Sequence, residues 1–147
     1  MPGKSCVFCD IAAGRGAATR VFDDDLCMGF LDHRPLFPGH VLLVPRRHHE
    51  TLAELPAQAL APFFANVQRL AVAVQRGVQA QGTFVAINNH VSQSVPHLHV
   101  HIVPRRRGDG LRGFFWPRSR YDDEAHLERV GAAIRAALLG LARAGDA

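Results

Sequence analysis

Apolar and polar residues alternate in several short segments of the chain with the two-residue period of β-strands. Residues 20–32 contain two such segments on either side of an acidic turn, which predicts a β-hairpin. Further strands are predicted over residues 39–45, 83–89 and 97–104, and the first and last of these end at a proline. The segment 97–104 alternates cleanly, so one of its faces is predicted to be apolar and the other polar.

Two other segments have the three- and four-residue spacing of an amphipathic α-helix. The first is predicted to begin at Pro56, since proline is favoured in the first turn of a helix, and to end near Gly82. Its apolar face comprises Leu60, Phe63, Phe64, Val67, Leu70, Ala71, Val74 and Val78. The second is predicted to begin in the acidic turn 122–124, where carboxylates suit the positive end of the helix dipole, and to run to Leu141.

The order of these elements, with hairpins between most of the strands, predicts the α+β class. We expect an antiparallel sheet that carries two helices. No repeat, low-complexity linker or change of composition divides the 147 residues, and this length suits one domain with one core. We therefore expect a single domain over residues 1–147, with its core at about 6–105 and a C-terminal loop and helix over 106–147.

Composition and charge restrict the class of partner without identifying it. No apolar run approaches the roughly 20 residues of a membrane span, so no membrane partner is expected. The start, MPGKSCVFCD, lacks the apolar region of a secretory signal, which predicts a cytoplasmic location. The net charge of +4 comes mostly from arginine, which favours polyanionic ligands. No nucleic-acid-binding motif accompanies this charge, and we expect no nucleic-acid partner.

The stretch HLHVHIVPRR, residues 97–106, places three histidines at alternate positions of a predicted strand. Alternate residues of a strand share a face about 7 Å apart, so His97, His99 and His101 project to one side. The apolar residues between them are predicted to bury against a helix. Three imidazoles on one face indicate chemistry near neutral pH. They suit either a zinc site or a nucleophile with a proton relay, and the pattern alone does not separate the two.

The motif His-Leu-His-Val-His-Ile-Val, residues 97–103, resembles the histidine-triad (HIT) family of nucleotide hydrolases and transferases. RPLFPGH at 34–40 and INNHVSQSVP at 87–96 extend the resemblance, which runs from about Cys6 to Arg105. It implies the HIT fold, with a sheet extended across a homodimer. It also implies cleavage at the α-phosphate of dinucleoside polyphosphates or nucleoside phosphoramidates. In such a reaction a covalent nucleotidyl-histidine forms, and a nucleoside monophosphate is released.

The resemblance assigns roles to particular residues. His99 matches the histidine that attacks phosphorus, His101 the one that binds a phosphate oxygen and assists the leaving group, and His40 the upstream histidine that supports this relay. Asp32 matches the position that binds the ribose hydroxyls. Polar positions around the phosphates are matched by Asn88, Gln93 and Ser94. An apolar wall for the base could come from Phe8, Ile11, Phe30 and Leu31, which core packing explains equally well.

Cys6 and Cys9 form a C-x-x-C pair, which by itself is half of a zinc signature. An odd number of cysteines argues against a disulfide framework. Many bacterial members of the HIT family with this N-terminal pair have a structural zinc, and its other two ligands match His48 and His97. The resemblance therefore implies a structural zinc held by two thiolates and two imidazoles, and it implies no redox cofactor.

Two other functions remain open at this point. One is a nucleotide-binding regulatory protein with little turnover, and the other is a metal-dependent hydrolase in which all three triad histidines are ligands. The segment 105–121, rich in arginine and aromatic residues, departs from the minimal family pattern. Trp116 or an arginine of this segment would reach a substrate's distal phosphates or second base, or else the aromatic residues pack the C-terminal segment or a dimer contact.

Overall fold

The computed structural model describes residues 5–112 and 119–141 of the chain. The chain divides into two compact units, residues 1–109 and 110–147. The first unit contains α1 (Val7–Ala12), β1 (Arg20–Asp23), β2 (Cys27–Leu31), β3 (Val41–Pro45), the short 3-10 helix η1 (Leu52–Glu54), α2 (Ala57–Gly77), β4 (Gly82–Ile87) and β5 (Val100–Arg105). The second contains α3 (Glu124–Leu139).

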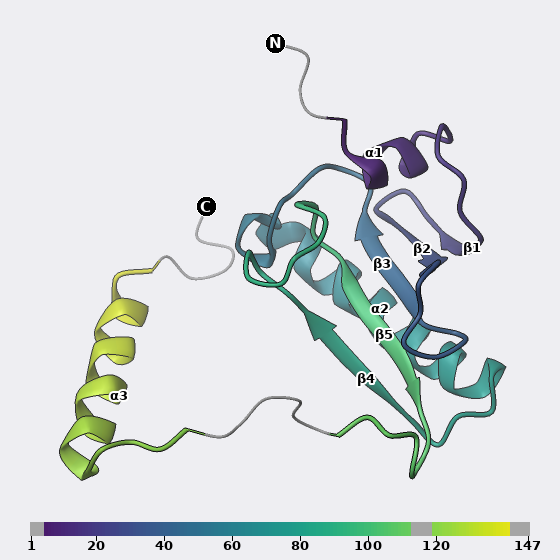
Figure 1. Cartoon of the computed structure of the whole chain (residues 1–147). Helices are drawn as coiled ribbons and strands as arrows, with labels where there is room; N and C mark the ends of the chain where they lie inside the picture. Colours follow the sequence, from purple (N-terminus) through teal and green to yellow (C-terminus); the bar gives the residue numbers. More distant parts are fainter. Residues whose placement is uncertain (1–4, 113–118, 142–147) are drawn as a thin grey trace. The chain divides into compact units, whose positions relative to one another are not determined.

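The five strands form one antiparallel sheet in the order β1-β2-β3-β5-β4 (Figure 1). The first two strands form the predicted hairpin, and the Asp24 carboxylate closes its turn by accepting hydrogen bonds from the N–H groups of Leu26 and Cys27. The three further strands are found near their predicted positions. The predicted α+β class, with an antiparallel sheet and helices, is confirmed.

The central strand β3 is buried along its whole length because both faces of the sheet are covered. Leu43 packs on one face in a cluster with the buried side of α2, to which Ala59, Phe63, Val67, Leu70 and Val74 contribute. Leu42 and Val44 point to the other face, where they pack with two α1 residues, Phe8 and Ile11. Figure 1 shows α2 running behind the strands and α1 near the carboxyl end of β3.

The triad strand β5 lies between β3 and β4. Leu98, Val100 and Ile102 are fully buried in the cluster formed with α2, which confirms the predicted burial of these residues against a helix. His101 pairs with Leu42 of β3, a residue of the cluster formed with α1. The histidines therefore face the α1 side of the sheet, away from α2.

Regular pairing of β5 begins at Val100, later than the predicted start at residue 97. Pro45, at the end of β3, has no N–H with which to continue the ladder, and its carbonyl oxygen accepts a hydrogen bond from Nε2 of the His97 ring at 2.8 Å. His97 and His99 consequently lie in a segment without regular strand pairing. The ring centroids of His99 and His101 are nevertheless only 4.9 Å apart.

The long predicted helix corresponds to α2, which has Pro56 as its N-cap. The second predicted helix is α3, and its N-cap Asp123 accepts a hydrogen bond from the N–H of His126 at 2.6 Å. The apolar side of α3 remains exposed, including Leu127 and Ile134. α1 was not predicted, because six residues are too few to show a helical period. No helix within residues 5–112 or 119–141 is long and apolar enough to cross a bilayer.

Candidate active site and metal site

An open pocket of about 840 Å³ lies on the α1 side of the sheet. Its size suits a small-molecule ligand. Apolar side chains from α1 and the sheet form much of its wall, among them Phe8, Ile11, Phe30, Leu31 and Leu42. Its polar lining includes Thr19, Asp32, Ser94, His99 and His101. An apolar wall with a few polar groups gathered at one place is typical of a small-molecule site.

His99 is almost completely buried at the edge of this pocket. Its Nδ1 lies 2.8 Å from the carbonyl oxygen of His97. Because a carbonyl oxygen can only accept a hydrogen bond, the proton of the neutral ring is on Nδ1, and Nε2 has the lone pair. The Phe8 ring meets the His99 ring edge-on with centroids 5.2 Å apart. The carbonyl of His97 thus fixes the tautomer of a neutral His99 ring and leaves the lone pair of Nε2 available to act as a nucleophile.

His40 and His101 form a chain of hydrogen bonds beside it. The N–H of Leu36 donates to Nδ1 of His40 at 3.1 Å, so the proton of the neutral His40 ring is on Nε2. That Nε2–H donates to Nδ1 of His101 at 3.0 Å. The remaining proton of His101 is therefore on Nε2, where this residue can donate to a ligand in the pocket.

Both relay imidazoles are neutral at pH 7. Burial, with smaller effects of the neighbouring His99 and His40, lowers the pKa of His101 to about 4, while the Asp32 carboxylate opposes the shift. Burial also lowers the pKa of His40, again against the opposing effect of Asp32. A neutral His101 retains one donor and one acceptor nitrogen, which a proton relay requires.

Asp32 follows β2 and lines the pocket. Its Oδ1 accepts a hydrogen bond from the N–H of Arg34 at 2.9 Å, and its Oδ2 lies 3.8 Å from Nδ1 of His40. The carboxylate is thereby held beside the relay, and it can accept hydrogen bonds from two vicinal hydroxyls of a ligand. Ser94 also lines the pocket, and it is exposed to solvent.

Gln93 and Asn88, both predicted near the phosphates, do not line this pocket. The Gln93 side chain instead fixes the loop between β4 and β5, because its amide donates to the carbonyl of Glu50 at 2.6 Å and its Oε1 accepts from the N–H of His90 at 2.8 Å. Asn88 directly follows β4, and its neighbour Asn89 accepts a hydrogen bond from the N–H of Leu52 at 2.9 Å. Asn89 is therefore the asparagine that anchors the loop.

Sequence reasoning missed part of the pocket, namely the segment 17–19 and His33. Alanine and threonine offer no chemical signal, and a single histidine after a strand has no pattern to mark it. The aromatic residues predicted to meet a substrate or to pack the C-terminal segment, Phe114, Phe115 and Trp116, lie outside the described residues. Two arginines at the start of this segment are engaged within the first unit, since Arg105 pairs with Asp109 at 2.6 Å and Arg106 donates to the carbonyl of Val78.

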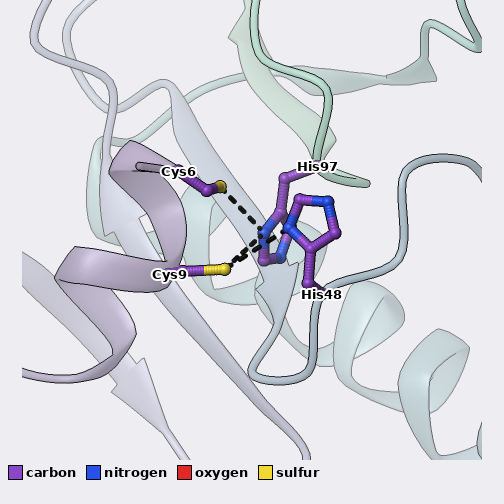
Figure 2. A group of neighbouring side chains, drawn as sticks. All are labelled: Cys6, Cys9, His48 and His97. Atoms are coloured by element: carbon purple, nitrogen blue, oxygen red, sulfur yellow. Dashed lines mark hydrogen bonds between the residues drawn. The ribbon is translucent and has the colours of Figure 1, made fainter. Parts of the chain in front are cut away.

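The four predicted metal ligands lie together beside this pocket. Cys6 and Cys9 point from α1 toward the rings of His97 and His48 (Figure 2). Nδ1 of His97 is 3.4 Å from Sγ of Cys6 and 3.5 Å from Sγ of Cys9, and Nδ1 of His48 is 3.4 Å from Sγ of Cys9. In a tetrahedral zinc site, with Zn–S of about 2.3 Å and Zn–N of about 2.0–2.1 Å, sulfur and nitrogen are about 3.5 Å apart. The donor set therefore fits a tetrahedral zinc ion.

The orientation of His97 also suits a ligand. Its Nε2–H donates to the carbonyl of Pro45, which leaves the lone pair on Nδ1, the nitrogen that faces the two thiols. Burial lowers the pKa of His97 to about 4, so the ring is neutral at pH 7. Burial and the neighbouring Cys6 raise the pKa of the Cys9 thiol to about 11, and a bound cation would favour the thiolate instead.

A second group of possible ligands, Asp32, His40 and His101, is better described as a hydrogen-bonded relay. Both His40 nitrogens already have hydrogen-bond partners, because Nε2 donates to Nδ1 of His101 and Nδ1 accepts from the N–H of Leu36. The 3.0 Å between the His40 and His101 nitrogens is a hydrogen-bond distance. The three triad rings do not meet at one ion either, because Nδ1 of His99 faces a carbonyl while Nδ1 of His97 faces the thiols.

A family model described as the HIT domain matches residues 14–108. The chain is 38% identical over 135 residues to an uncharacterized HIT-like protein of Mycobacterium tuberculosis, covering 90% of this chain and 92% of that protein. It is 33% identical over 110 residues to an adenylylsulfatase of Arabidopsis thaliana, covering 74% of this chain and 56% of that protein. The chain therefore belongs to the HIT family, as the triad motif predicted.

A solved structure supports the same relationship at the level of the fold. A zinc-bound histidine triad family protein of Mycobacterium smegmatis aligns with a TM-score of 0.69 and 37% identity, over 88% of this chain and 97% of that one. The five-stranded sheet with its helices is therefore the HIT fold. The HIT family includes enzymes that act on nucleotides, and the Arabidopsis relative bears such a name.

Proposed function

We propose that the protein is a nucleotide hydrolase or nucleotidyl transferase that cleaves at the α-phosphate and releases a nucleoside monophosphate. The observation that supports this most strongly is the fixed tautomer of His99, whose Nδ1–H is bonded to the carbonyl of His97 in a ring that lines the pocket. This tautomer leaves the lone pair on Nε2, where attack on phosphorus requires it. The substrate classes are nucleoside phosphoramidates and dinucleoside polyphosphates, and the activity for which the Arabidopsis relative is named, that of an adenylylsulfatase, belongs to the same kind of chemistry.

The reaction proceeds in two displacements. Nε2 of His99 forms a bond to the α-phosphorus, and the bond from phosphorus to the leaving group breaks. The leaving group takes the Nε2 proton of His101, whose Nδ1 accepts from His40, and the positive charge that the His99 ring acquires in the adduct offsets the negative charge left on His101 until water returns the proton. Water then attacks the same phosphorus, its proton goes to Nε2 of His101, and the P–N bond breaks to regenerate neutral His99. Asp32 holds the ribose, and Asn88, Gln93 and Ser94 are proposed to support the phosphates or the loop beside them.

The proposal includes a structural zinc held by Cys6, Cys9, His48 and His97. The donor spacing supports it, and the Mycobacterium smegmatis relative is described as zinc-bound. Bound zinc would cross-link the N-terminal segment to the triad segment. It would leave His99 free for the reaction, because His99 is not among these four residues. No redox cofactor is part of the proposal.

We also propose a homodimer in the cytoplasm, in which the two sheets join. The strand β4 stands at one edge of the sheet, and its Val85 is 43% exposed. The opposite edge strand, β1, has a bulge between Arg20 and Phe22, and its Arg20 and Asp23 form an ion pair. Both features disfavour the pairing of this edge with a strand of another chain. Light scattering of the purified protein tests the dimer, and a Val85→Lys substitution at the β4 edge is expected to favour the monomer.

Turnover of a nucleotide panel in ¹⁸O-labelled water tests the proposed function. An adenosine phosphoramidate, adenylyl sulfate and a diadenosine polyphosphate are incubated with the protein. We expect at least one to release adenosine monophosphate with the label in the monophosphate. Tight nucleotide binding without any product would favour the regulatory protein instead. Product formation that a chelator abolishes in folded protein would favour the metal-dependent hydrolase.

A further inference from the structure

Phe8 lies between the two cysteines of the metal site and contacts both groups of histidines. Its side chain is buried, and its ring meets the His97 ring at a centroid distance of 5.8 Å and the His99 ring at 5.2 Å, both edge-on. The Phe30 ring contacts the Phe8 ring from a third side, with centroids 5.5 Å apart. The ring is therefore in direct contact with one metal-ligand candidate and with the nucleophile.

The position of Phe8 depends on how α1 is anchored. α1 has only six residues and no side-chain N-cap hydrogen bond, so it is too short to be stable by itself. Its C-terminal end is held by Arg20, which donates to the carbonyl of Ile11, and by Arg46, which donates to the carbonyl of Ala12. At its N-terminal end, the sulfurs of Cys6 and Cys9 contact the imidazoles of the metal site (Figure 2), whereas Asp10 of the first turn pairs with the nearby Arg15.

The orientation of His99 is set from two sides, and both sides lead back to the same four residues. On one side its Nδ1–H is bonded to the backbone of His97, whose own ring faces Cys6 and Cys9. On the other side the Phe8 ring packs against it, and Phe8 stands between the same two cysteines in the sequence. Movement of the cysteine pair would therefore displace the Phe8 support of the His99 ring, whereas His97 would still be held by its hydrogen bond to the carbonyl of Pro45.

We propose that Phe8 is a positioning residue for His99, and that ligation of Cys6 and Cys9 fixes its place. This inference rests on the proposed function, in which Nε2 of His99 attacks phosphorus. With the four ligand atoms held by an ion, the Phe8 ring keeps Nε2 aligned with the phosphorus. Without the ion, the N-terminal half of α1 loosens, the edge contact is lost, and the imidazole samples orientations that do not react.

Two substitutions of Phe8 separate positioning from simple lining of the pocket. Phe8→Leu keeps an apolar wall but removes the ring edge, whereas Phe8→Tyr keeps the ring. The measured quantities are the single-turnover rate at which the nucleotidyl-histidine forms and the Kd of adenosine monophosphate, both on zinc-loaded protein. We expect Phe8→Leu to slow formation about tenfold with Kd changed less than about threefold, and Phe8→Tyr to retain the rate.

Ile11→Val serves as the matched control, because Ile11 is buried on the same helix and lines the same pocket. It is expected to alter Kd rather than the rate of adduct formation. If Phe8→Leu changes Kd alone, as the control does, Phe8 is only a wall of the pocket and the proposal is wrong. If zinc-loaded wild type forms no adduct at all, the proposed function fails, and the spectroscopic test below still decides whether Phe8 positions His99.

Removal of zinc tests the coupling. We expect a chelator to slow adduct formation in wild type about as much as Phe8→Leu does, and to add little in the Phe8→Leu variant, since both changes remove one support. The ¹⁵N resonances of the His99 imidazole provide a readout that does not depend on turnover. One Nδ1–H tautomer is expected in zinc-loaded wild type, and an averaged pattern in zinc-loaded Phe8→Leu and in chelated wild type. Fully additive rate effects, or identical ¹⁵N patterns in all three samples, would overturn the proposal.

Discussion

His97 and His99 are neighbours on one face of the same segment, yet their rings are used in opposite ways. At His97 a backbone carbonyl accepts a hydrogen bond from Nε2–H, and Nδ1 faces two thiols. At His99 a backbone carbonyl accepts a hydrogen bond from Nδ1–H, and the ring lines the pocket with its lone pair on Nε2. The comparison teaches that the backbone carbonyl determines which ring nitrogen keeps a lone pair. The groups that this nitrogen faces, two thiols at His97 and the pocket at His99, then determine whether it suits a metal ion or a substrate.

Removal of the His99 imidazole should have the largest effect, and this effect should fall on the reaction rate and not on the zinc content. We expect His99→Ala to lower the rate of monophosphate release by roughly 10⁴-fold, because no other group in the relay can form the covalent intermediate. The zinc content and the binding of adenosine monophosphate should remain. Turnover and metal analysis of the same preparation measure this. Loss of zinc in this variant would mean that the two positions are not separate in function.

Removal of His40 should have the next largest effect. Without the donor to Nδ1 of His101, the tautomer that places a proton on Nε2 of His101 is no longer fixed. We expect His40→Ala to lower kcat by about 10²-fold, within the usual range for general acid–base assistance, and to leave the zinc content unchanged. Steady-state kinetics with a poor leaving group should show the effect most clearly. A variant as fast as wild type would remove His40 from the mechanism.

Loss of one thiolate should affect the metal site before the chemistry. We expect Cys9→Ser to lose most of its zinc and to lower Tm by about 5 °C or more, because metal affinity contributes to the stability of the folded state. Cys27→Ala is the matched control. Cys27 is buried in the core, where its sulfur accepts a hydrogen bond from Asn66 at 3.1 Å, so this variant should lose stability but keep about one zinc per chain. Equal zinc content in the two variants would contradict the assigned ligands.

The smallest expected effect concerns the titration of His101, which its burial shifts to lower pH. The pKa of His101 is lowered from 6.5 to about 4, chiefly by burial, so its Cε1–H NMR signal should not shift between pH 7 and pH 5. The unfolded chain takes up this proton near pH 6.5 and the folded chain only near pH 4. The contribution of His101 to stability is therefore present above pH 6.5 and declines as the pH falls toward 4. Titration of this signal near pH 6.5 would show that the ring is not shielded as described.

Sequence patterns were sufficient where a residue's environment follows from its spacing. The alternation around the triad predicted the burial of Leu98, Val100 and Ile102, and the four proposed metal ligands were brought together as predicted. Spacing could not predict α1, which is too short to show a period, and it placed the start of β5 too early. β5 is paired only from Val100 onward on both sides, because Pro45 of β3 has no N–H and β4 ends at Ile87, and this depends on which residues the fold places opposite each other.

The sequence also could not show which nitrogen of each imidazole is free. That depends on the carbonyls of Pro45 and His97, which are common to every residue and carry no sequence signal. Gln93 illustrates the same limit, because its residue type suits a phosphate contact but the structure uses its amide to hold the loop to Glu50. Residue type indicates the available chemistry, whereas the local backbone decides how it is used.

The most direct test of the division between the two histidines is a rapid-quench experiment on zinc-loaded wild type. Substrate with an α-³²P label is mixed with the protein and quenched with base, because a phosphoramidate is labile in acid, and the labelled peptide is mapped by mass spectrometry. The account predicts a nucleotidyl group on His99 alone, with His97 unmodified. A label on His97 or His101, or product formed with no labelled protein at any time point, would contradict it.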